Sequence, residues 1–385
     1  MKEQFLYNML YNMSLKEKIG QMIMIDYRDT LEMNVELDDV LKKYSPGGFI
    51  LFKSNIQNYN QTKKLLSDIK QSSDIPVMVS ADQEGGRVQR LDERVGFDTI
   101  PPMGEIGITM NEEEVFNLGK KMGEELKNIG VDMDMAPVLD VFSNPENRVI
   151  ADRAFGTNSD IVKRLAMALS KGLQEEKIIP VGKHFPGHGD TIKDSHVDLP
   201  IITKDLEELK RLELVPFVEA IDKKIPGLMI GHLAVPKITG DNNPASLSKV
   251  MINDLLRKDL GYEGLVMPDS LKMKALSNHF TNKEIYLRCI GSGNDIMLMP
   301  QNINEAFNTI YDAVNDGVIK EEQINNSVYR ILSTKFDIGF FDKELNEFIN
   351  KKSRSLWSTF FYNPLLFSFS FCDNVSTLFL ILLGI

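Results

Sequence analysis

One short segment gathers most of the potential catalytic groups of this chain. Residues 183–196, KHFPGHGDTIKDSH, hold three of the five histidines, together with two lysines and two aspartates. Histidine changes charge near neutral pH and also binds metal ions, so the segment indicates proton transfer or a metal site. The histidines are spaced H-x3-H-x7-H around Pro and Gly, unlike the helical spacing of a zinc protease. We therefore predict no metal and keep zinc ligation as the alternative.

Two residues near the end of this segment fit proton transfer. Asp194 precedes His196 by two positions, and in an irregular loop its carboxylate can accept the Nδ1 hydrogen bond of the imidazole. Nε2 is then able to exchange a proton near neutral pH. We predict that His196 is a general acid/base and that Asp194 orients it, while Gly187 and Gly189 let the loop bend. For His188 we keep a structural role in the core as the alternative.

A second reactive group is expected where the run GLVMPDS (264–270) ends. There Asp269 follows a buried apolar strand, and a carboxylate at the end of a rigid strand can act as a nucleophile or stabilise a developing positive charge. Its alternative role is to cap the N-terminus of a helix in SLKMKAL. We predict that Asp269 is the partner of His196 across one pocket.

Further polar groups are suited to binding a hydroxyl-rich ligand. Carboxylates accept hydrogen bonds from vicinal hydroxyls, whereas guanidinium and ammonium groups donate to oxygens, a combination that fits sugar recognition. The predicted substrate-binding residues are Asp82, Arg90, Arg153, Lys183 and His184.

Eight apolar runs alternate with helical patterns and must position these side chains. Such alternation is typical of βα units around a parallel sheet, and eight units favour a (β/α)8 TIM barrel over an open doubly wound sheet. Catalytic groups of a barrel lie after the C-terminal ends of its strands, where Asp82, Asp140, Lys183, His184, His232 and Asp269 are found. The runs are 20–26, 47–52, 75–82, 131–140, 178–185, 226–236, 264–270 and 294–300.

Composition excludes several classes of partner. The net charge of −11 argues against nucleic acid, whose phosphates require a basic surface. Only two cysteines occur and the N-terminus has no apolar signal core, so we expect a cytoplasmic protein without a disulfide framework. No cofactor is indicated. We expect a monomer.

The C-terminal composition differs from the rest of the chain. We expect one catalytic domain over residues 1–345 and a non-catalytic apolar tail over 346–385. Within 355–385 the only charged residue is Asp373. Pro364 and Asp373 interrupt this segment, and the clean run 375–385 is shorter than the about 20 residues that span a membrane, so we do not expect membrane association.

Seven stretches between residues 13 and 340 resemble glycoside hydrolase family 3, and within it the bacterial β-N-acetylglucosaminidases of the NagZ type. The most specific is the segment 183–196 with its KHFPGHG and DSH motifs. The others are MSLKEKIGQMIMI, GGFILF, ADQEGGRVQRL, APVLDV, VIADRAFG and GLVMPDSLKMKAL.

The resemblance implies a (β/α)8 barrel that removes terminal β-linked N-acetylglucosamine with retention of configuration. It implies that Asp269 is the nucleophile, that His196 is the acid/base and that Asp194 is its partner. It assigns sugar binding to Asp82, Arg90, Arg153, Lys183 and His184. It also implies that the substrate is a small glycoside or a muropeptide.

Two departures from the family pattern leave alternatives open. Pro268 stands before Asp269, where relatives of this type are expected to have Ser or Thr. Many Gram-positive relatives are also expected to carry a second α/β domain at the position where this sequence has the apolar segment. The alternatives are a β-glucosidase or a glycoside phosphorylase of the same family, and an inactive sugar-binding or membrane-tethered protein.

Overall fold

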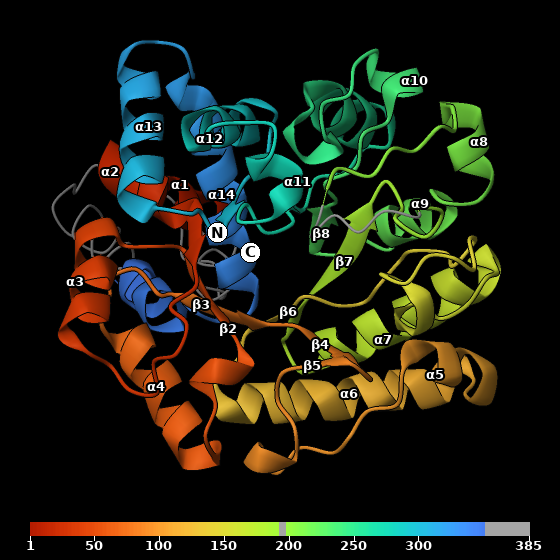
Figure 1. The fold of residues 1–385 in the computed structure, drawn as a ribbon. Coiled ribbons are helices and arrows are strands. Elements are labelled where there is room, and N and C mark those ends of the chain that lie inside the picture. Colours follow the sequence, from red (N-terminus) through yellow and green to blue (C-terminus); the bar gives the residue numbers. More distant parts are fainter. Residues whose placement is uncertain (192–197, 351–385) are drawn as a thin grey trace, which may run out of the picture.

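Eight parallel strands form a barrel that is surrounded by helices (Figure 1). The computed structural model describes residues 1–191 and 198–350. The strand order is β10-β1-β2-β3-β6-β7-β8-β9, and the two end strands are joined by hydrogen bonds from Asp295 N to Val266 O (2.7 Å) and from Leu271 N to Leu298 O (3.0 Å). The predicted barrel is therefore confirmed, and the alternative of an open sheet is wrong.

Each predicted apolar run contains one strand of the barrel. The strands are β1 (Ile23–Ile25), β2 (Gly48–Leu51), β3 (Met78–Ala81), β6 (Met133–Asp134), β7 (Ile179–Phe185), β8 (Gly227–Ile230), β9 (Leu265–Pro268) and β10 (Met297–Leu298). Strand β6 is much shorter than the run 131–140, because Pro137 has no N–H to donate. The extended chain then resumes its pairing with β7 through a single bridge between Val138 and Lys183.

Fourteen α-helices are assigned within the described residues, and most of them lie outside the barrel. They are α1 (Lys2–Asn12), α2 (Leu15–Gln21), α3 (Val35–Tyr44), α4 (Tyr59–Gln71), α5 (Met103–Thr109), α6 (Glu112–Ile129), α7 (Ser159–Glu175), α8 (Leu206–Arg211), α9 (Val215–Asp222), α10 (Pro236–Thr239), α11 (Lys274–Ser277), α12 (Asn282–Gly291), α13 (Ile303–Asn315) and α14 (Glu321–Asp337). A π-helix covers Val250–Asp259.

Local sequence sets several helix boundaries. Helices α2 and α12 each begin with a capping box, in which two side chains pair with otherwise unpaired backbone N–H groups. The residues are Ser14 and Glu17 for α2, and Thr281 and Glu284 for α12. The amphipathic stretch 205–224 forms two helices, α8 and α9, because Pro216 cannot donate within a continuous helix and instead lies in the first turn of α9. No helix within the described residues is long and apolar enough to cross a membrane.

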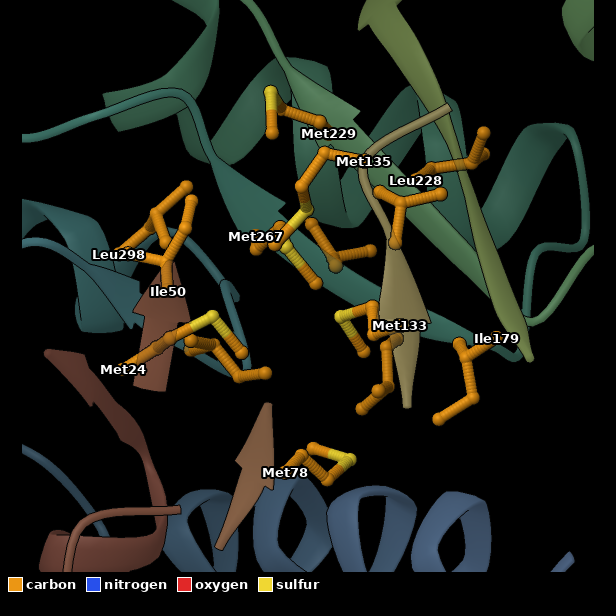
Figure 2. Close-up of a cluster of buried hydrophobic side chains, with 14 of the residues drawn as sticks. Met24, Ile50, Met78, Met133, Met135, Ile179, Leu228, Met229, Met267 and Leu298 are labelled. Carbon is orange, nitrogen blue, oxygen red and sulfur yellow. The ribbon is translucent and has the colours of Figure 1, made fainter. Parts of the chain in front are cut away.

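Methionine fills much of the barrel interior (Figure 2). The unbranched, polarizable side chain adapts to the irregular gaps that remain inside the barrel. The labelled interior methionines are Met24, Met78, Met133, Met135, Met229 and Met267, and all are buried. This apolar packing makes a rigid base for the loops that follow the strands.

Candidate active site

The C-terminal ends of the strands surround a cavity of about 410 Å³. Six of the predicted site residues line it: Asp82, Arg90, Arg153, Lys183, His184 and Asp269. They come from the exits of β3, β7 and β9, from a hairpin after β3 and from the loop after β6, as expected for a barrel. The fold therefore brings together groups that lie up to 187 positions apart in the sequence, from 82 to 269.

A chain of alternating charges forms the floor of this cavity. The Lys183 ammonium donates to Asp82 (2.9 Å) and pairs with Glu84 (2.5 Å). Arg153 donates to both oxygens of Glu84 at 2.8 Å, and Arg90 donates to Asp82 at 2.9 Å. Bidentate and charge-assisted contacts of this kind hold the side chains in one geometry.

The floor groups are ionised despite their burial. Burial raises the pKa of Glu84, but Arg153 and Lys183 outweigh it and lower that pKa to about 2. For Asp82, burial is again outweighed by Lys183 and Arg90, which hold the carboxyl pKa well below its usual range. Burial lowers the pKa of Lys183, yet Asp82 and Glu84 raise it above its ordinary value. The floor thus presents fixed charges to a ligand near neutral pH.

Sequence reasoning missed Glu84. The hairpin of β4 (Gln83–Gly85) and β5 (Val88–Gln89) carries this residue, and its turn needs positive φ at Gly85 (+100°) and Gly86 (+52°). The available signal was the Asp82-Gln83-Glu84 pattern, because side chains two apart in an extended strand point to the same side. Both carboxylates consequently reach Lys183.

His184 is oriented by a carboxylate from another strand exit. Its Nδ1 lies 2.7 Å from Asp140 Oδ2, and its Nε2 lies 3.5 Å from Arg153 Nη2. Asp140 also accepts from the backbone N–H of His188 at 2.6 Å. Since a carboxylate accepts only, Nδ1–H of His184 donates to Asp140, and Nε2 lies on the Arg153 side of the cavity. The role of Asp140 was not predicted, although its place at a strand exit was noted.

His188 also lines the cavity, but it is buried and its ring is hydrogen-bonded to Thr191. Its Nδ1 lies 2.6 Å from the Thr191 hydroxyl. Burial, followed by the nearby His184, lowers the pKa of His188 to about 4, so the ring is neutral at physiological pH. Gly189 is required for close packing here, since a Cβ would lie 1.7 Å from the carbonyl oxygen of Val141.

Asp269 stands at the end of β9 with its carboxylate in the cavity. Its backbone N–H donates to Ile230 O (2.8 Å), and its Oδ1 accepts from the N–H of Ser270 (2.7 Å). Burial raises the pKa of this carboxyl, but His184 and His232 outweigh burial, and the pKa lies below its ordinary value. The alternative role as a helix cap is wrong, because α11 begins only at Lys274.

His232 supports the backbone beside Asp269. Its Nδ1 lies 2.7 Å from the Ser246 hydroxyl and its Nε2 lies 2.9 Å from Ser270 O. The carbonyl of Ser270 can only accept, so Nε2–H of His232 donates to it. This arrangement fixes the turn that carries the Asp269 carboxylate.

Two predicted site residues, Asp194 and His196, lie outside the described residues, and their roles remain predictions. The assignment of a separate non-catalytic tail to residues 346–385 also remains a prediction, because most of that segment lies outside the described residues. Within the described residues, no group of three or more His, Cys, Asp or Glu side chains has the arrangement of a metal site.

The comparisons with known proteins agree with each other. The model of the glycosyl hydrolase family 3 N-terminal domain matches residues 14–334. Beta-hexosaminidase LpqI of Mycobacterium tuberculosis (strain ATCC 25618 / H37Rv) is 34% identical over 331 residues, which cover 84% of this chain and 83% of LpqI. Beta-hexosaminidase A of Pseudoalteromonas piscicida is 30% identical over 372 residues, with 84% of this chain and 61% of that protein covered.

A solved structure is similar over the same region. The glycoside hydrolase family 3 β-N-acetylglucosaminidase from Paenibacillus sp. str. FPU-7 superposes with a TM-score of 0.82 and 34% identity. The match covers 85% of this chain and 63% of that one. The chain therefore spans less than two thirds of the length of two of these three relatives.

Proposed function

Because the chain belongs to glycosyl hydrolase family 3, we propose that it is a retaining exo-β-N-acetylglucosaminidase that removes terminal, non-reducing β-linked N-acetylglucosamine. The names of the relatives, two β-hexosaminidases and a β-N-acetylglucosaminidase, support N-acetylglucosamine as the sugar that is removed. The cavity volume falls in the range of small-molecule sites, roughly 300–1,000 Å³.

The observation that carries this proposal is the state of Asp269. A nucleophilic carboxylate must be ionised and held rigidly beside the bound sugar. Asp269 meets both conditions, because its pKa lies below its ordinary value and its backbone is fixed between Ile230 and Ser270. Opposite charges on the floor supply acceptors and donors for sugar hydroxyls.

The proposed reaction has two steps. Asp269 attacks the anomeric carbon through an oxocarbenium-like transition state, and the bond to the leaving oxygen breaks as His196 gives that oxygen a proton. A water molecule then attacks the glycosyl-Asp269 ester while neutral His196 accepts its proton, which releases the sugar and regenerates the carboxylate. Asp194 holds the imidazole of His196 in the tautomer that this transfer requires.

A pair of chromogenic glycosides tests the proposal. We expect hydrolysis of nitrophenyl β-N-acetylglucosaminide with a kcat/KM at least about tenfold above that of the β-glucoside, because a matched pocket discriminates a missing group by that much or more. Preference for the glucoside would make the chain a β-glucosidase. Binding of both without turnover would leave an inactive sugar-binding protein.

The natural substrate we propose is a peptidoglycan fragment that is recycled in the cytoplasm. This part rests on the family resemblance of the segment 183–196. A neutral imidazole does not repel an anionic acceptor, so product analysis in phosphate buffer must separate hydrolysis from phosphorolysis. Free N-acetylglucosamine is the expected product, and sugar 1-phosphate would identify a phosphorylase.

A further inference from the structure

One buried acid near the floor of the cavity takes no part in the proposed reaction. Asp134 is the last residue of β6 and is fully buried, yet it does not line the cavity. Its Oδ1 accepts a hydrogen bond from the backbone N–H of Gln83 at 3.0 Å. Its Oδ2 is buried and has no hydrogen-bond partner within residues 1–191 and 198–350. Because buried polar atoms are normally paired, this half-satisfied side chain requires a reason.

Asp132, two residues earlier, is a carboxylate with both oxygens paired. Its Oδ2 accepts from the N–H of Val79 at 2.9 Å, and its Oδ1 pairs with the Lys70 ammonium at 2.6 Å. Asp132 and Asp134 therefore both hold a backbone N–H of the chain that forms or follows β3. They differ in that only Asp132 has a cation as its second partner.

No cation is placed to keep Asp134 charged. Within the part of the chain that the structure describes, Asp134 forms no ion pair, because the Lys183 ammonium pairs with Asp82 (2.9 Å) and Glu84 (2.5 Å) instead. Burial raises the pKa of Asp134 well above its usual range, and Asp82 and Glu84 raise it further. The N–H of Gln83 and the charge of Lys183 oppose this rise only in part. The side chain is therefore a neutral acid near neutral pH.

Gln83, the residue that Asp134 holds, is a junction of the floor. It lies between Asp82 and Glu84 in the sequence. Its Oε1 accepts from the backbone N–H groups of Arg90 (3.2 Å) and Leu91 (3.1 Å), and its Nε2 donates to Leu91 O at 2.8 Å. Three side chains that line the cavity, Asp82, Glu84 and Arg90, consequently depend on where the Gln83 backbone lies.

We propose that Asp134 is a positioning residue that, as an uncharged side chain, holds Gln83 and so sets the carboxylates on either side of it. The inference rests on the proposed function, in which those carboxylates bind the sugar. A further buried anion beside the floor would compete with Asp82 and Glu84 for their cation. A neutral acceptor supplies the hydrogen bond without that competition.

Two matched substitutions on one strand test the positioning. Asp134→Ala and Asp132→Ala each remove a carboxylate that accepts a backbone N–H, but only the first N–H belongs to the floor. For Asp134→Ala, kcat/KM on nitrophenyl β-N-acetylglucosaminide should fall between about tenfold and 10²-fold, because small displacements of binding groups have effects of this size. The inhibition constant of free N-acetylglucosamine should rise as well. For Asp132→Ala, both constants should stay within about twofold of the wild-type values, since that site lies apart from the floor.

Asp134→Asn separates positioning from a general loss of structure. The amide oxygen can accept the Gln83 N–H, and the amide carries no charge. This variant should therefore retain the kcat/KM and the inhibition constant of the wild-type protein within about twofold, the range of a substitution that keeps the interaction. If Asp134→Ala does not fold, the inhibition constant of Asp134→Asn decides in its place.

The uncharged state of Asp134 has a readout of its own. A group whose pKa is higher in the folded than in the unfolded chain stabilises the fold at low pH, and this stability is lost as pH rises. The unfolding equilibrium constant of the wild-type protein divided by that of Asp134→Asn should thus rise about tenfold per pH unit between about pH 5 and pH 7. The charged groups that act on this site, Lys183, Asp82 and Glu84, are common to both proteins.

Three results would overturn the inference and leave the glycosidase standing. A loss of kcat/KM in Asp134→Asn as large as in Asp134→Ala would show that a negative charge is required. Equal losses in Asp134→Ala and Asp132→Ala would show a general structural role. A ratio of unfolding constants that does not change with pH would show an ionised Asp134. If the wild-type protein cleaves no β-glycoside, the proposed function fails, and calorimetric binding of N-acetylglucosamine to the same variants decides the role of Asp134 by the same criteria.

Discussion

Two fully buried lysines occupy opposite ends of the barrel, and their pKa values are shifted in opposite directions. Lys183 at the catalytic end lies between the carboxylates of Asp82 and Glu84, which raise its pKa although burial lowers it. Within the described residues, the Lys335 ammonium in α14 donates hydrogen bonds only to the Gln21 amide oxygen and the Pro76 carbonyl, each at 2.5 Å, and burial lowers its pKa to about 7.

The difference lies in the partners, since both side chains are removed from water. A buried ammonium keeps its charge when carboxylates are adjacent, and it tends to lose its proton when only neutral dipoles surround it. Gln21 and Pro76 precede strands β1 and β3, so Lys335 joins elements at the N-terminal end of the barrel. That end of such a barrel usually serves stability, whereas the C-terminal end carries the chemistry. Substitutions at the two ends should therefore separate activity from stability.

The largest expected effect is loss of the nucleophile at the catalytic end. For Asp269→Ala, kcat on nitrophenyl β-N-acetylglucosaminide should fall by more than about 10⁴-fold, as when a catalytic nucleophile is deleted elsewhere. The thermal midpoint should change little by comparison. Mass spectrometry of a glycosyl-enzyme trapped with a slow fluorinated substrate should place the sugar on Asp269, and its attachment to another residue would reject the assignment.

His196→Ala tests the proposed general acid/base, the second catalytic group at the C-terminal end of the barrel. Turnover of a glycoside with a poor leaving group should fall roughly 10²–10⁴-fold, the usual contribution of general acid–base catalysis. Nitrophenol leaves without protonation, so formation of the glycosyl-enzyme from its glycoside should be affected far less. Equal losses on both substrates would remove His196 from this role.

A third substitution removes ion pairs from the floor of the cavity and should reduce both the activity and the stability of the protein. Glu84→Gln keeps the shape of the side chain but leaves Lys183 and Arg153 with one carboxylate fewer in a buried site. Removal of one partner from a buried charge network costs about 3–5 kcal/mol of unfolding free energy. Denaturant titration should show this loss for Glu84→Gln. For the exposed Asp98→Asn, whose partner is Lys121, a loss of at most about 1 kcal/mol is expected. Equal losses in the two variants would show that Glu84 does not balance the buried charges of Lys183 and Arg153.

Sequence patterns were sufficient for the fold because each barrel strand is a short, continuously apolar run. The same runs located Asp82, Lys183 and Asp269, since a strand exit is defined by where the apolar run stops. Lys335 could not be found in this way. Its burial depends on how α14 packs against the strand entrances, and no local pattern records that contact.

Hydrogen bonds between side chains at the ends of different strands could not be predicted from the sequence either. Asp140 and His184 are 44 positions apart, and only closure of the barrel places them 2.7 Å from each other. The arrangement resembles the one predicted for Asp194 and His196, in which a carboxylate orients an imidazole. Local spacing can suggest the second pair, but it carries no information about the first.

The smallest expected effect is the contribution of Lys335, at the N-terminal end of the barrel, to the pH dependence of the unfolding free energy. In the folded protein the pKa of Lys335 is about 7, whereas its ordinary value is 10.5, so between these values the unfolded chain binds more protons. Stability contributed by this group therefore rises with pH across the window and is lost as pH falls toward 7, with a slope of at most about 1.4 kcal/mol per pH unit. Lys335→Met keeps the length of the side chain and removes the titration.

The measurement is the unfolding free energy of the wild-type protein minus that of Lys335→Met, followed from about pH 8 to pH 10. Subtraction removes groups common to both proteins, including Lys183. The carboxylate of Asp132, which is paired with Lys70 at 2.6 Å, favours the charged form of Lys335. If that carboxylate kept Lys335 protonated, the difference would stay flat, as it should for the exposed control Lys343→Met, and the contrast between the two buried lysines would disappear. A difference that rises with pH requires a neutral amine at the N-terminal end, because no other group is changed between the two proteins.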